Sequence, residues 1–301
     1  MTLINVSASL PTAMWAAIRM FSTPTTRYQV DELLLLLSPT SVFRPKEDSK
    51  EKPPARRALD TLQDLGILEK SSDEIGLSAE HQELAGAALR TYLDRLRITC
   101  LAAKHNDGLL GQTDRGALDL TRALVWFLAQ DPLGPPLGWT EVQPLQSSVN
   151  WASGLVFSNS TRWNLFSYWA PALGFAGQHS VLGDDAARTL VPDCTTAVQA
   201  TVERLWPAGA LLEAEEFVAH LSAELPVLPE GQYARQLGIS TDAPKKVSSV
   251  LSFALLRGHD EGWISLIRRQ DSQRDVVLVD PDRVDRAQRV TEVEVHGSHS
   301  D

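Results

Sequence analysis

The chain has 301 residues, of which 43% are hydrophobic and 22% are charged, so it can bury the cores of more than one domain. Its formal net charge of -10 excludes a protein that coats nucleic acid by bulk electrostatic attraction, because phosphate binding depends on clustered cations. The two cysteines, Cys100 and Cys194, lie far apart without CxxC spacing, which excludes a disulfide framework and indicates a reducing compartment.

The first predicted element is a helix near the N-terminus. No Lys or Arg precedes the apolar stretch there, and Pro11 interrupts it, which is atypical of a signal peptide. Because proline is tolerated in the first turn, the pattern predicts a helix over residues 11–21. The leucine run at residues 33–37 is far shorter than the roughly 18 apolar residues that a membrane helix needs. We therefore expect a soluble, cytoplasmic protein that does not contact a membrane.

Two further helices and a hairpin complete a predicted N-terminal module. Apolar residues at helical spacing predict a second helix over residues 30–37. The segment ARRALDTLQDLGIL predicts a third helix, with Gly66 as its C-terminal cap. Residues 67–69 and 75–78 flank the turn sequence SSDE, which is typical of a hairpin. Because this order is that of a winged helix-turn-helix, we predict such a domain over residues 1–80.

A helical middle domain is predicted over residues 81–192. Its Ala- and Leu-rich start indicates one long helix over residues 79–105, and a further helix is indicated at residues 118–128. The sequence WNLFSYWAPALGF indicates a third, partly helical stretch. Aromatic residues dominate both cores and interface hot spots, so the tryptophans here are either buried packing, the default, or a surface for a partner. The candidates for a partner interface are Trp139, Trp151, Trp163 and Trp169.

The opening order of elements recurs in the C-terminal third. A helix is predicted over residues 195–206, followed by a short apolar stretch at residues 209–212 and a helix over about residues 213–225. An amphipathic helix follows, because five apolar residues fall at positions i, i+3, i+4, i+7 and i+8. They are Val247, Val250, Leu251, Ala254 and Leu255.

A second hairpin is predicted from residues 263–268 and 275–279, which flank the polar turn RQDSQ. We therefore predict a second winged-helix domain over residues 193–295, with a disordered tail at residues 296–301. The predicted fold class is mainly α with small β-hairpin wings, in which two winged helix-turn-helix modules flank a helical middle region.

The sequence contains none of the standard catalytic signatures. It has no GxxxxGK, GxGxxG, HExxH or GxSxG motif, and its histidines and cysteines lack ligand spacing, so we expect no enzyme, no metal and no cofactor. A divergent nuclease remains an alternative, although no Lys follows at ExK spacing and a solvated turn with a charged strand face is the better explanation of the carboxylates. The acidic candidates for such a nuclease are Asp184, Asp185, Asp280, Asp282, Glu292 and Glu294.

Basic residues outside the apolar stripes suggest local DNA-binding faces, for which an ordinary solvated surface is the alternative. The C-terminal candidates, on the third helix and the wing, are Lys245, Lys246, Ser249, Ser252, Arg257, Arg268, Arg269 and Arg274. The N-terminal candidates are Lys50, Lys52, Arg56 and Arg57. Acidic residues are interleaved with this second group, so its local charge nearly cancels and a protein interface or a solvated face is the stronger expectation there.

Five segments spread over most of the chain resemble a known family. They are SPTSVFRP, ARRALDTLQDLGIL, FSYWAPALGFAG, LVPDCTTAV and EFVAHLSAELPVLPEGQYAR. Together they resemble the DpdG family of bacterial gene clusters that place 7-deazapurine bases in DNA. The resemblance implies a role in phage defence that accompanies DNA modification, with partners encoded by the same cluster. It implies no reaction and no catalytic residue.

The leading hypothesis is a non-catalytic DNA-binding or adaptor subunit of a phage-defence system linked to DNA modification. Its expected partners are double-stranded DNA, bound through the local basic faces, and other proteins of the same cluster, and a homodimer is left open. One alternative is a tandem winged-helix scaffold subunit of an SMC-type complex, which the acidic net charge favours. Another is a transcriptional regulator, whose two modules would recognise two half-sites.

Overall fold

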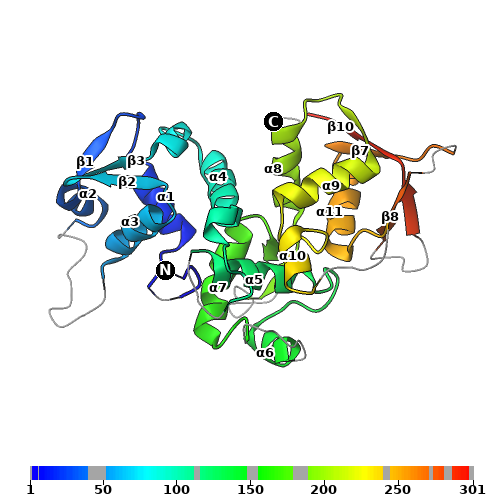
Figure 1. The fold of residues 1–301 in the computed structure, drawn as a ribbon, viewed down its shortest axis with the longest axis horizontal. Coiled ribbons are helices and arrows are strands. Elements are labelled where there is room, and N and C mark those ends of the chain that lie inside the picture. Colours follow the sequence, from blue (N-terminus) through cyan, green and yellow to red (C-terminus); the bar gives the residue numbers. More distant parts are fainter. Residues whose placement is uncertain are drawn as a thin grey trace. The chain divides into compact units, whose positions relative to one another are not determined.

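The computed structural model describes residues 2–5, 7–39, 52–111, 116–147, 155–178, 189–239, 245–270, 274–280 and 287–297. The chain divides into two compact units. The first comprises Met1–Asp107 and Thr113–Leu120, and the second comprises Gly108–Gln112 and Thr121–Asp301. Within the described residues the fold is mainly helical with small antiparallel sheets, which confirms the predicted class at that level (Figure 1). The division into three domains stays a prediction.

The first unit opens with three helices and a three-stranded sheet, which we call the N-terminal module. Its helices are α1 (Pro11–Ile18), α2 (Val30–Leu37) and α3 (Pro54–Asp64), and its strands are β1 (Arg27–Gln29), β2 (Leu68–Ser71) and β3 (Glu74–Leu77). The sheet order is β1-β3-β2, and both strand pairs are antiparallel. The predicted helices and the β2–β3 hairpin are confirmed. Strand β1 was not predicted, because three residues are too few to display an alternating pattern.

The apolar stripe of α3 forms the centre of this module. Ala58, Leu59 and Leu62 are almost completely buried, and α3 packs mainly on α1. The helix ends as predicted at Gly66, which has a φ of +71°. The N–H of Gly66 donates to Gln63 (2.9 Å) and that of Ile67 donates to Leu62 (2.9 Å), which is the Schellman pattern. This ending directs the chain from α3 into β2.

The long helix predicted over residues 79–105 is wrong. The elements there are the 3-10 helix η1 (Ala79–Leu84), α4 (Leu89–Leu101) and the 3-10 helix η2 (Ala103–His105). Between η1 and α4, Gly86 has a φ of +64°, and its N–H donates to the carbonyl of Phe21 (3.0 Å). A backbone group that pairs with a distant residue cannot continue the local helix, so a tertiary contact overrides the helical composition.

A buried histidine fixes the segment that follows the hairpin. The Ser78 hydroxyl donates to the Gly66 carbonyl (2.7 Å) and lies 3.0 Å from His81 Nδ1, and His81 Nε2 lies 3.1 Å from the Thr99 hydroxyl. Because the Ser78 proton is already committed to Gly66, Nδ1 is the donor and Nε2 accepts from Thr99. Burial lowers the pKa of His81, which favours this neutral form.

The second unit begins with helices around an aromatic core. Helix α5 (Leu118–Leu128) starts in the first unit and continues into the second, where α6 (Trp139–Ser147), α7 (Ser160–Ala172) and the antiparallel pair β4 (Ala176–Gln178) and β5 (Leu190–Pro192) follow. The ring of Phe157 lies 5.9 Å from that of Trp126, 5.2 Å from Trp163 and 5.1 Å from Phe166. Within the described residues, no helix combines the length and the apolar composition that crossing a membrane requires.

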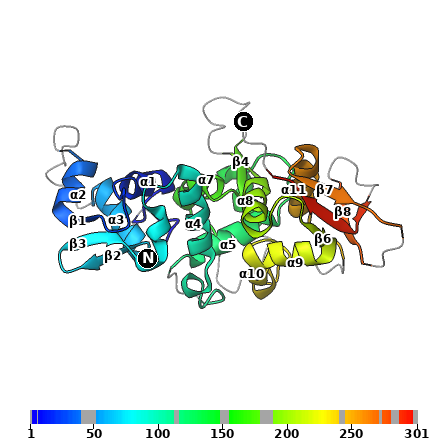
Figure 2. The same ribbon diagram turned by 90° about the horizontal axis from the view of Figure 1, so that it is seen from above.

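The remainder of the second unit, which we call the C-terminal module, repeats the order of the N-terminal module. Its helices are α8 (Thr195–Leu205), α9 (Ala214–Glu224), α10 (Gln232–Gln236) and α11 (Ser249–Asp260). Its strands are β6 (Leu211–Glu213), β7 (Ile264–Ile267), β8 (Val276–Val279), β9 (Ala287–Val290) and β10 (Glu292–Val295). In the sheet β6-β10-β7, as in β1-β3-β2, the last strand lies between the other two. Helices α8 and α11 pack together (Figure 1 and Figure 2).

The predicted pairing of residues 263–268 with residues 275–279 is wrong. Strand β7 pairs with β10, whereas β8 pairs with β9 as a separate hairpin. The inward side chains of β10, Val293 and Val295, are buried, so this strand completes the core-facing sheet. Pairing neighbours in sequence was the simplest assumption, but burial of β10 determines the register.

Four residues of the predicted apolar stripe, Val250, Leu251, Ala254 and Leu255, lie on α11 and are at most 1% exposed, which confirms the buried face of this helix. The fifth, Val247, is also buried but precedes the helix. The hydroxyl of Ser248 caps the helix by accepting from the N–H of Leu251 (3.4 Å). Near the other end, Gly258 lies against the buried ring of Trp263, and a Cβ at this position would overlap the ring. This contact joins α11 to the start of β7.

Candidate functional site

The β8–β9 hairpin lies against the first turns of α11. The N–H of Val279 donates to the Ser252 hydroxyl (3.0 Å), which donates to the carbonyl of Val247 (3.3 Å). Ser252 is therefore completely buried and has no surface with which to contact DNA, so we remove it from the candidate set. The remaining serine candidate, Ser249, is half-buried at the start of the helix.

Two cations of the C-terminal module share one carboxylate. Lys245 Nζ lies 3.3 Å from Asp275 Oδ1, and Arg289 Nη1 lies 2.6 Å from Asp275 Oδ2. The hydrogen bond from Arg289, reinforced by that from Lys245, lowers the pKa of Asp275 and keeps it ionised. The predicted DNA contact Lys245 thus lies beside a fixed negative charge, which weakens its attraction for phosphate.

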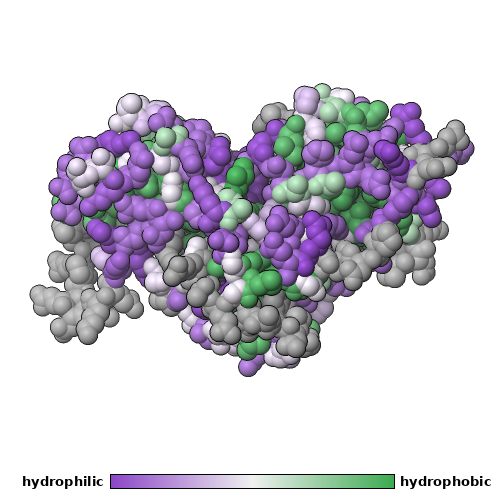
Figure 3. Space-filling view, in the orientation of Figure 1, coloured by the Kyte–Doolittle hydropathy of each residue, from purple (hydrophilic) through white to green (hydrophobic). Residues whose placement is uncertain are grey.

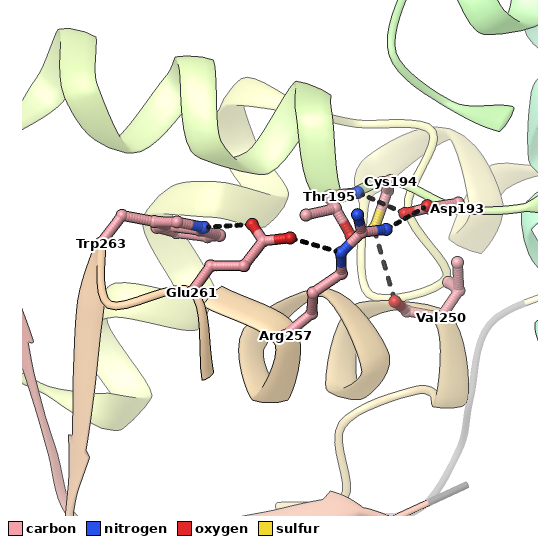
Figure 4. Close-up of polar contacts among 7 residues, drawn as sticks. All are labelled: Asp193, Cys194, Thr195, Val250, Arg257, Glu261 and Trp263. Atoms are coloured by element: carbon pink, nitrogen blue, oxygen red, sulfur yellow. Dashed lines mark hydrogen bonds and ion pairs between the residues drawn. The ribbon is translucent and has the colours of Figure 1, made fainter. Parts of the chain in front are cut away.

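Arg257, another predicted DNA contact, belongs to a polar cluster that connects three elements (Figure 4). Its Nη1 lies 3.3 Å from Asp193 Oδ2, and its Nε lies 2.7 Å from Glu261 Oε1. The second oxygen of Glu261 accepts from Trp263 Nε1 (3.2 Å), and Asp193 Oδ1 accepts from the N–H of Thr195 (2.8 Å). The guanidinium therefore holds the start of α8 and the end of α11 together.

The wing cations differ in their pairing. Arg269 Nε lies 2.6 Å from Glu292 Oε2, a carboxylate of β10, so this cation is also neutralised within the chain. Arg274 is exposed. Lys246 and Arg268 are exposed and, within the described part of the chain, form no ion pair. These last two cations are the ones that the chain leaves to solvent.

The N-terminal candidates are neutralised on α3 itself. Lys52 Nζ lies 2.7 Å from Asp60 Oδ2, and Arg56 Nε lies 3.0 Å from Asp60 Oδ1. Arg57 is half-buried, and Lys50 lies outside the described residues. Two of the four N-terminal candidates, Lys52 and Arg56, thus share the single carboxylate of Asp60.

Two of the four tryptophan candidates for a partner interface are core residues. Trp163 and Trp169 are completely buried, so we remove both from the candidate partner interface. They serve the core, which was the default interpretation. Trp139 is half-buried at the start of α6, and Trp151 lies outside the described residues.

The acidic nuclease candidates that the structure describes do not form a metal site. Within the described residues, no group of three or more His, Cys, Asp or Glu side chains could hold a metal ion. Asp184, Asp185, Asp282 and His299 lie outside these residues. His296, predicted as part of a disordered tail, is ordered instead, because its N–H donates to the Trp263 carbonyl (2.9 Å) and its Nε2 lies 2.7 Å from Ser265 Oγ.

A groove that the sequence did not indicate lies in the C-terminal module. It has a volume of about 570 Å³ and is lined by α9, by residues 229–235 and by residues 245–247. Glu230 lines it with one buried carboxyl oxygen, Oε2, that has no hydrogen-bond partner within the described chain. Burial raises the pKa of this carboxyl. The surface over α9 mixes hydrophobic and hydrophilic residues (Figure 3).

These features define a mainly helical protein with two modules of like strand order, in which Lys52, Arg56, Lys245, Arg257 and Arg269 of the candidate cations form ion pairs within the chain. A family model for DpdG-like proteins matches residues 1–272, so the chain belongs to the DpdG-like family, as its sequence segments indicated. Membership associates the chain with the Dpd 7-deazaguanine DNA modification system and its proteins. The comparisons with curated proteins and with solved structures found no match.

Proposed function

We propose that the protein is a non-catalytic adaptor of the Dpd system, built on two winged-helix modules that bind partner proteins rather than recognise DNA sequence. The strand orders β1-β3-β2 and β6-β10-β7 support the winged-helix assignment. In each module the first strand precedes the second helix, and the other two strands follow the helix that would be the recognition helix. The β8–β9 hairpin is then an insertion in the wing of the C-terminal module.

The cover over α11 is the observation that carries the proposal. A recognition helix presents its N-terminal residues to the major groove. In α11 those turns contact β8 through Ser252 and Val279, and no residue from Ser249 to Leu256 is fully exposed. The helix packs in addition against α8 and β7. A winged helix closed in this way is suited to binding proteins through other surfaces.

The pairing of the cations supports the same conclusion. Binding to phosphates requires cations whose counterions are mobile and can be released. Lys245, Arg257 and Arg269 instead have carboxylates of the same chain as partners, and these cannot diffuse away. Affinity for duplex DNA is therefore expected to be low, in keeping with the formal net charge of -10.

The test is to co-express the full chain with each protein of its modification cluster and to determine the mass of any complex by size-exclusion chromatography with light scattering. We expect a complex of fixed stoichiometry with at least one of these proteins, and none with an unrelated acidic protein. Fluorescence anisotropy with unmodified and 7-deazaguanine-containing duplexes completes the test. Tight binding of the isolated chain to duplex, with a steep salt dependence that Lys246→Glu and Arg268→Glu abolish, would overturn the proposal in favour of direct DNA binding.

A further inference from the structure

The groove of the C-terminal module combines an apolar floor with an unoccupied backbone edge. Val218 of α9, Val247 and Val276 of β8 contribute apolar side chains to its wall. The segment 245–247 runs parallel to β8, with a bridge between Lys246 and Val277. Lys246 is the strand-like residue of this segment, because Lys245 before it has a φ of +68° and Ser248 after it caps α11. What the outer side of the segment can bind is therefore decided by the backbone groups of Lys246.

The hydrogen bonds of this segment show which groups are available. The N–H of Val277 donates to the Lys245 carbonyl (2.8 Å), and the N–H of Val247 donates to the Val277 carbonyl (3.0 Å). Because successive residues of a strand direct their backbone groups to opposite sides, the N–H and C=O of Lys246 point away from β8. Within the described residues neither group has a backbone partner. An unpaired edge of this kind is a template for another strand.

Glu230 lies on the same side of the segment as the unpaired groups of Lys246. The N–H of Ser248, two residues further along, points in the same direction as that of Lys246 and donates to Glu230 Oε1. The other oxygen, Oε2, is buried without a partner in the described chain. An acceptor in this state costs free energy until a donor reaches it. Because Oε2 has almost no accessible surface, a backbone N–H added beside Lys246 reaches this oxygen when the Glu230 side chain turns toward the groove.

The charges around the groove favour an acidic occupant. Lys246 lines the groove, is exposed and forms no ion pair within the described residues, and Arg235 lines it as well, whereas the charge of Lys245 is paired with Asp275. The Arg235 side chain donates to the backbone carbonyl of Glu230, which leaves its positive charge uncompensated by that contact. The carboxylate of Glu215 is at the α9 wall. Acidic side chains that alternate with apolar ones would meet both the cations and the valine floor.

We propose that this groove binds an extended acidic segment of a partner protein, which pairs with the backbone N–H and C=O of Lys246 and donates a backbone N–H to Glu230 Oε2. The proposal rests on the adaptor function and names the chemistry of its partner. Main-chain hydrogen bonds to Lys246 provide the affinity, and the alternation of acidic and apolar side chains provides the specificity.

The probe for the test is a terminally blocked peptide of alternating Val and Asp, added to the isotope-labelled full chain and followed through its amide NMR signals. We expect the signals of Lys246 and Ser248 to shift in a saturable way. A peptide of alternating Val and Lys, and the Val and Asp peptide methylated on alternate backbone nitrogens, are the matched controls. Both control peptides should bind at least about tenfold more weakly. The first reverses the charges of the peptide, and the second removes its backbone N–H donors.

Two variants of the chain complete the design. Glu230→Gln keeps the size of the side chain and an acceptor for Ser248 but directs an amide against the peptide N–H, and Lys246→Glu reverses an exposed charge of the groove. Both should weaken the peptide about tenfold. Arg268→Glu, which makes the same charge change at an exposed position outside the groove lining, should leave it unchanged. Lys246→Glu keeps the test valid if Glu230→Gln disturbs folding, because Lys246 is exposed.

The outcomes separate the two proposals. Absence of peptide-induced shifts at Lys246, equal binding of the methylated peptide, or displacement of the peptide by a single-stranded oligonucleotide would overturn the groove proposal. If a cluster protein still forms its complex with the Lys246→Glu variant in any of these cases, the adaptor function stands and only the groove assignment falls. If the peptide binds as expected but no cluster protein forms a complex, the adaptor function falls and the groove assignment stands.

Discussion

The N-terminal and C-terminal modules connect their strands in the same order, but they differ in what lies beside the third helix. In the N-terminal module the partly exposed face of α3 bears Arg56, Arg57 and Asp60, so it is polar and carries its own counterions. In the C-terminal module the corresponding helix, α11, is covered by β8 and displays no fully exposed residue in its first two turns. The same order of elements thus supports two different surfaces.

The difference lies in the β8–β9 hairpin, which has no counterpart among the described residues of the N-terminal module. Strands β8 and β9 lie between β7 and β10 in sequence but outside their sheet in space. Their contact with α11 removes a helix face, and their contact with residues 245–247 forms one wall of the groove around Glu230. In the C-terminal module the hairpin therefore covers a face of α11 and borders a groove, whereas the corresponding face of α3 is partly exposed.

The largest contrast between the modules is expected from adding one methyl group at Gly258. Its Cβ would overlap the buried ring of Trp263, so Gly258→Ala should destabilise the C-terminal module by about 3 kcal/mol. Gly66→Ala in the N-terminal module meets open space and only the strain of a φ of +71°, so it should cost about 1 kcal/mol. Denaturant unfolding of both variants measures the two costs. An equal cost would mean that Trp263 yields without penalty.

A smaller effect is expected from removing the hydroxyl between α11 and the hairpin. Ser252→Ala leaves the N–H of Val279 without its acceptor in a buried place, which should cost about 2 kcal/mol. Hydrogen exchange should then accelerate at Val279, because its amide loses protection. The matched change Ser249→Ala, at a half-buried position, should cost less than about 0.5 kcal/mol. If Ser252→Ala lowered affinity for DNA instead of stability, the cover over α11 would not exist in solution.

The smallest contrast concerns the dependence of stability on pH. The stability of the N-terminal module should rise with pH, and that of the C-terminal module should fall. Burial lowers the pKa of His81 below its ordinary value of 6.5, so the stabilisation that it gives is complete above pH 6.5 and is lost as the pH falls below it. Burial raises the pKa of Glu230 above its ordinary value of 4.5, so its contribution is complete below pH 4.5 and is lost as the pH rises through the folded pKa.

His81 and Glu230 each exchange at most one proton on unfolding. Each therefore changes the free energy of unfolding by at most about 1.4 kcal/mol per pH unit. Hydrogen exchange measured separately for β2–β3 and for α11, after correction for the intrinsic effect of pH on exchange, distinguishes the modules in one sample. His81→Gln should flatten the dependence of the first, and Glu230→Gln that of the second. The same sign of slope in both wild-type modules, unaltered by these changes, would contradict the assignment of the two groups.

Local patterns in the sequence predicted much of each module. The stripes of α3 and α11, the cap at Gly66 and the β2–β3 hairpin were all predicted, since each depends on spacing within a short segment. The candidate site was predicted less well. Ser252 lies off the apolar stripe and nevertheless is buried, because a strand from elsewhere in the chain covers it. Lys245 and Arg257 have carboxylate partners 30 and 64 residues away, which no local pattern can indicate.

What the sequence by itself determined is most of the helices, though not α6, α10 or the break before α4, together with the buried faces of α3 and α11 and membership of the DpdG-like family, because these follow from short-range periodicity and from residue identity along the chain. Only the tertiary structure decided that β7 pairs with β10, that β8 lies on α11 and that Glu230 is enclosed beside Lys246. The physical reason is that strand pairing and burial of charge depend on which distant segments exclude water from one another. Strand pairing and the burial of charge are set by the packing of the whole unit, and they produce no periodic pattern in the sequence.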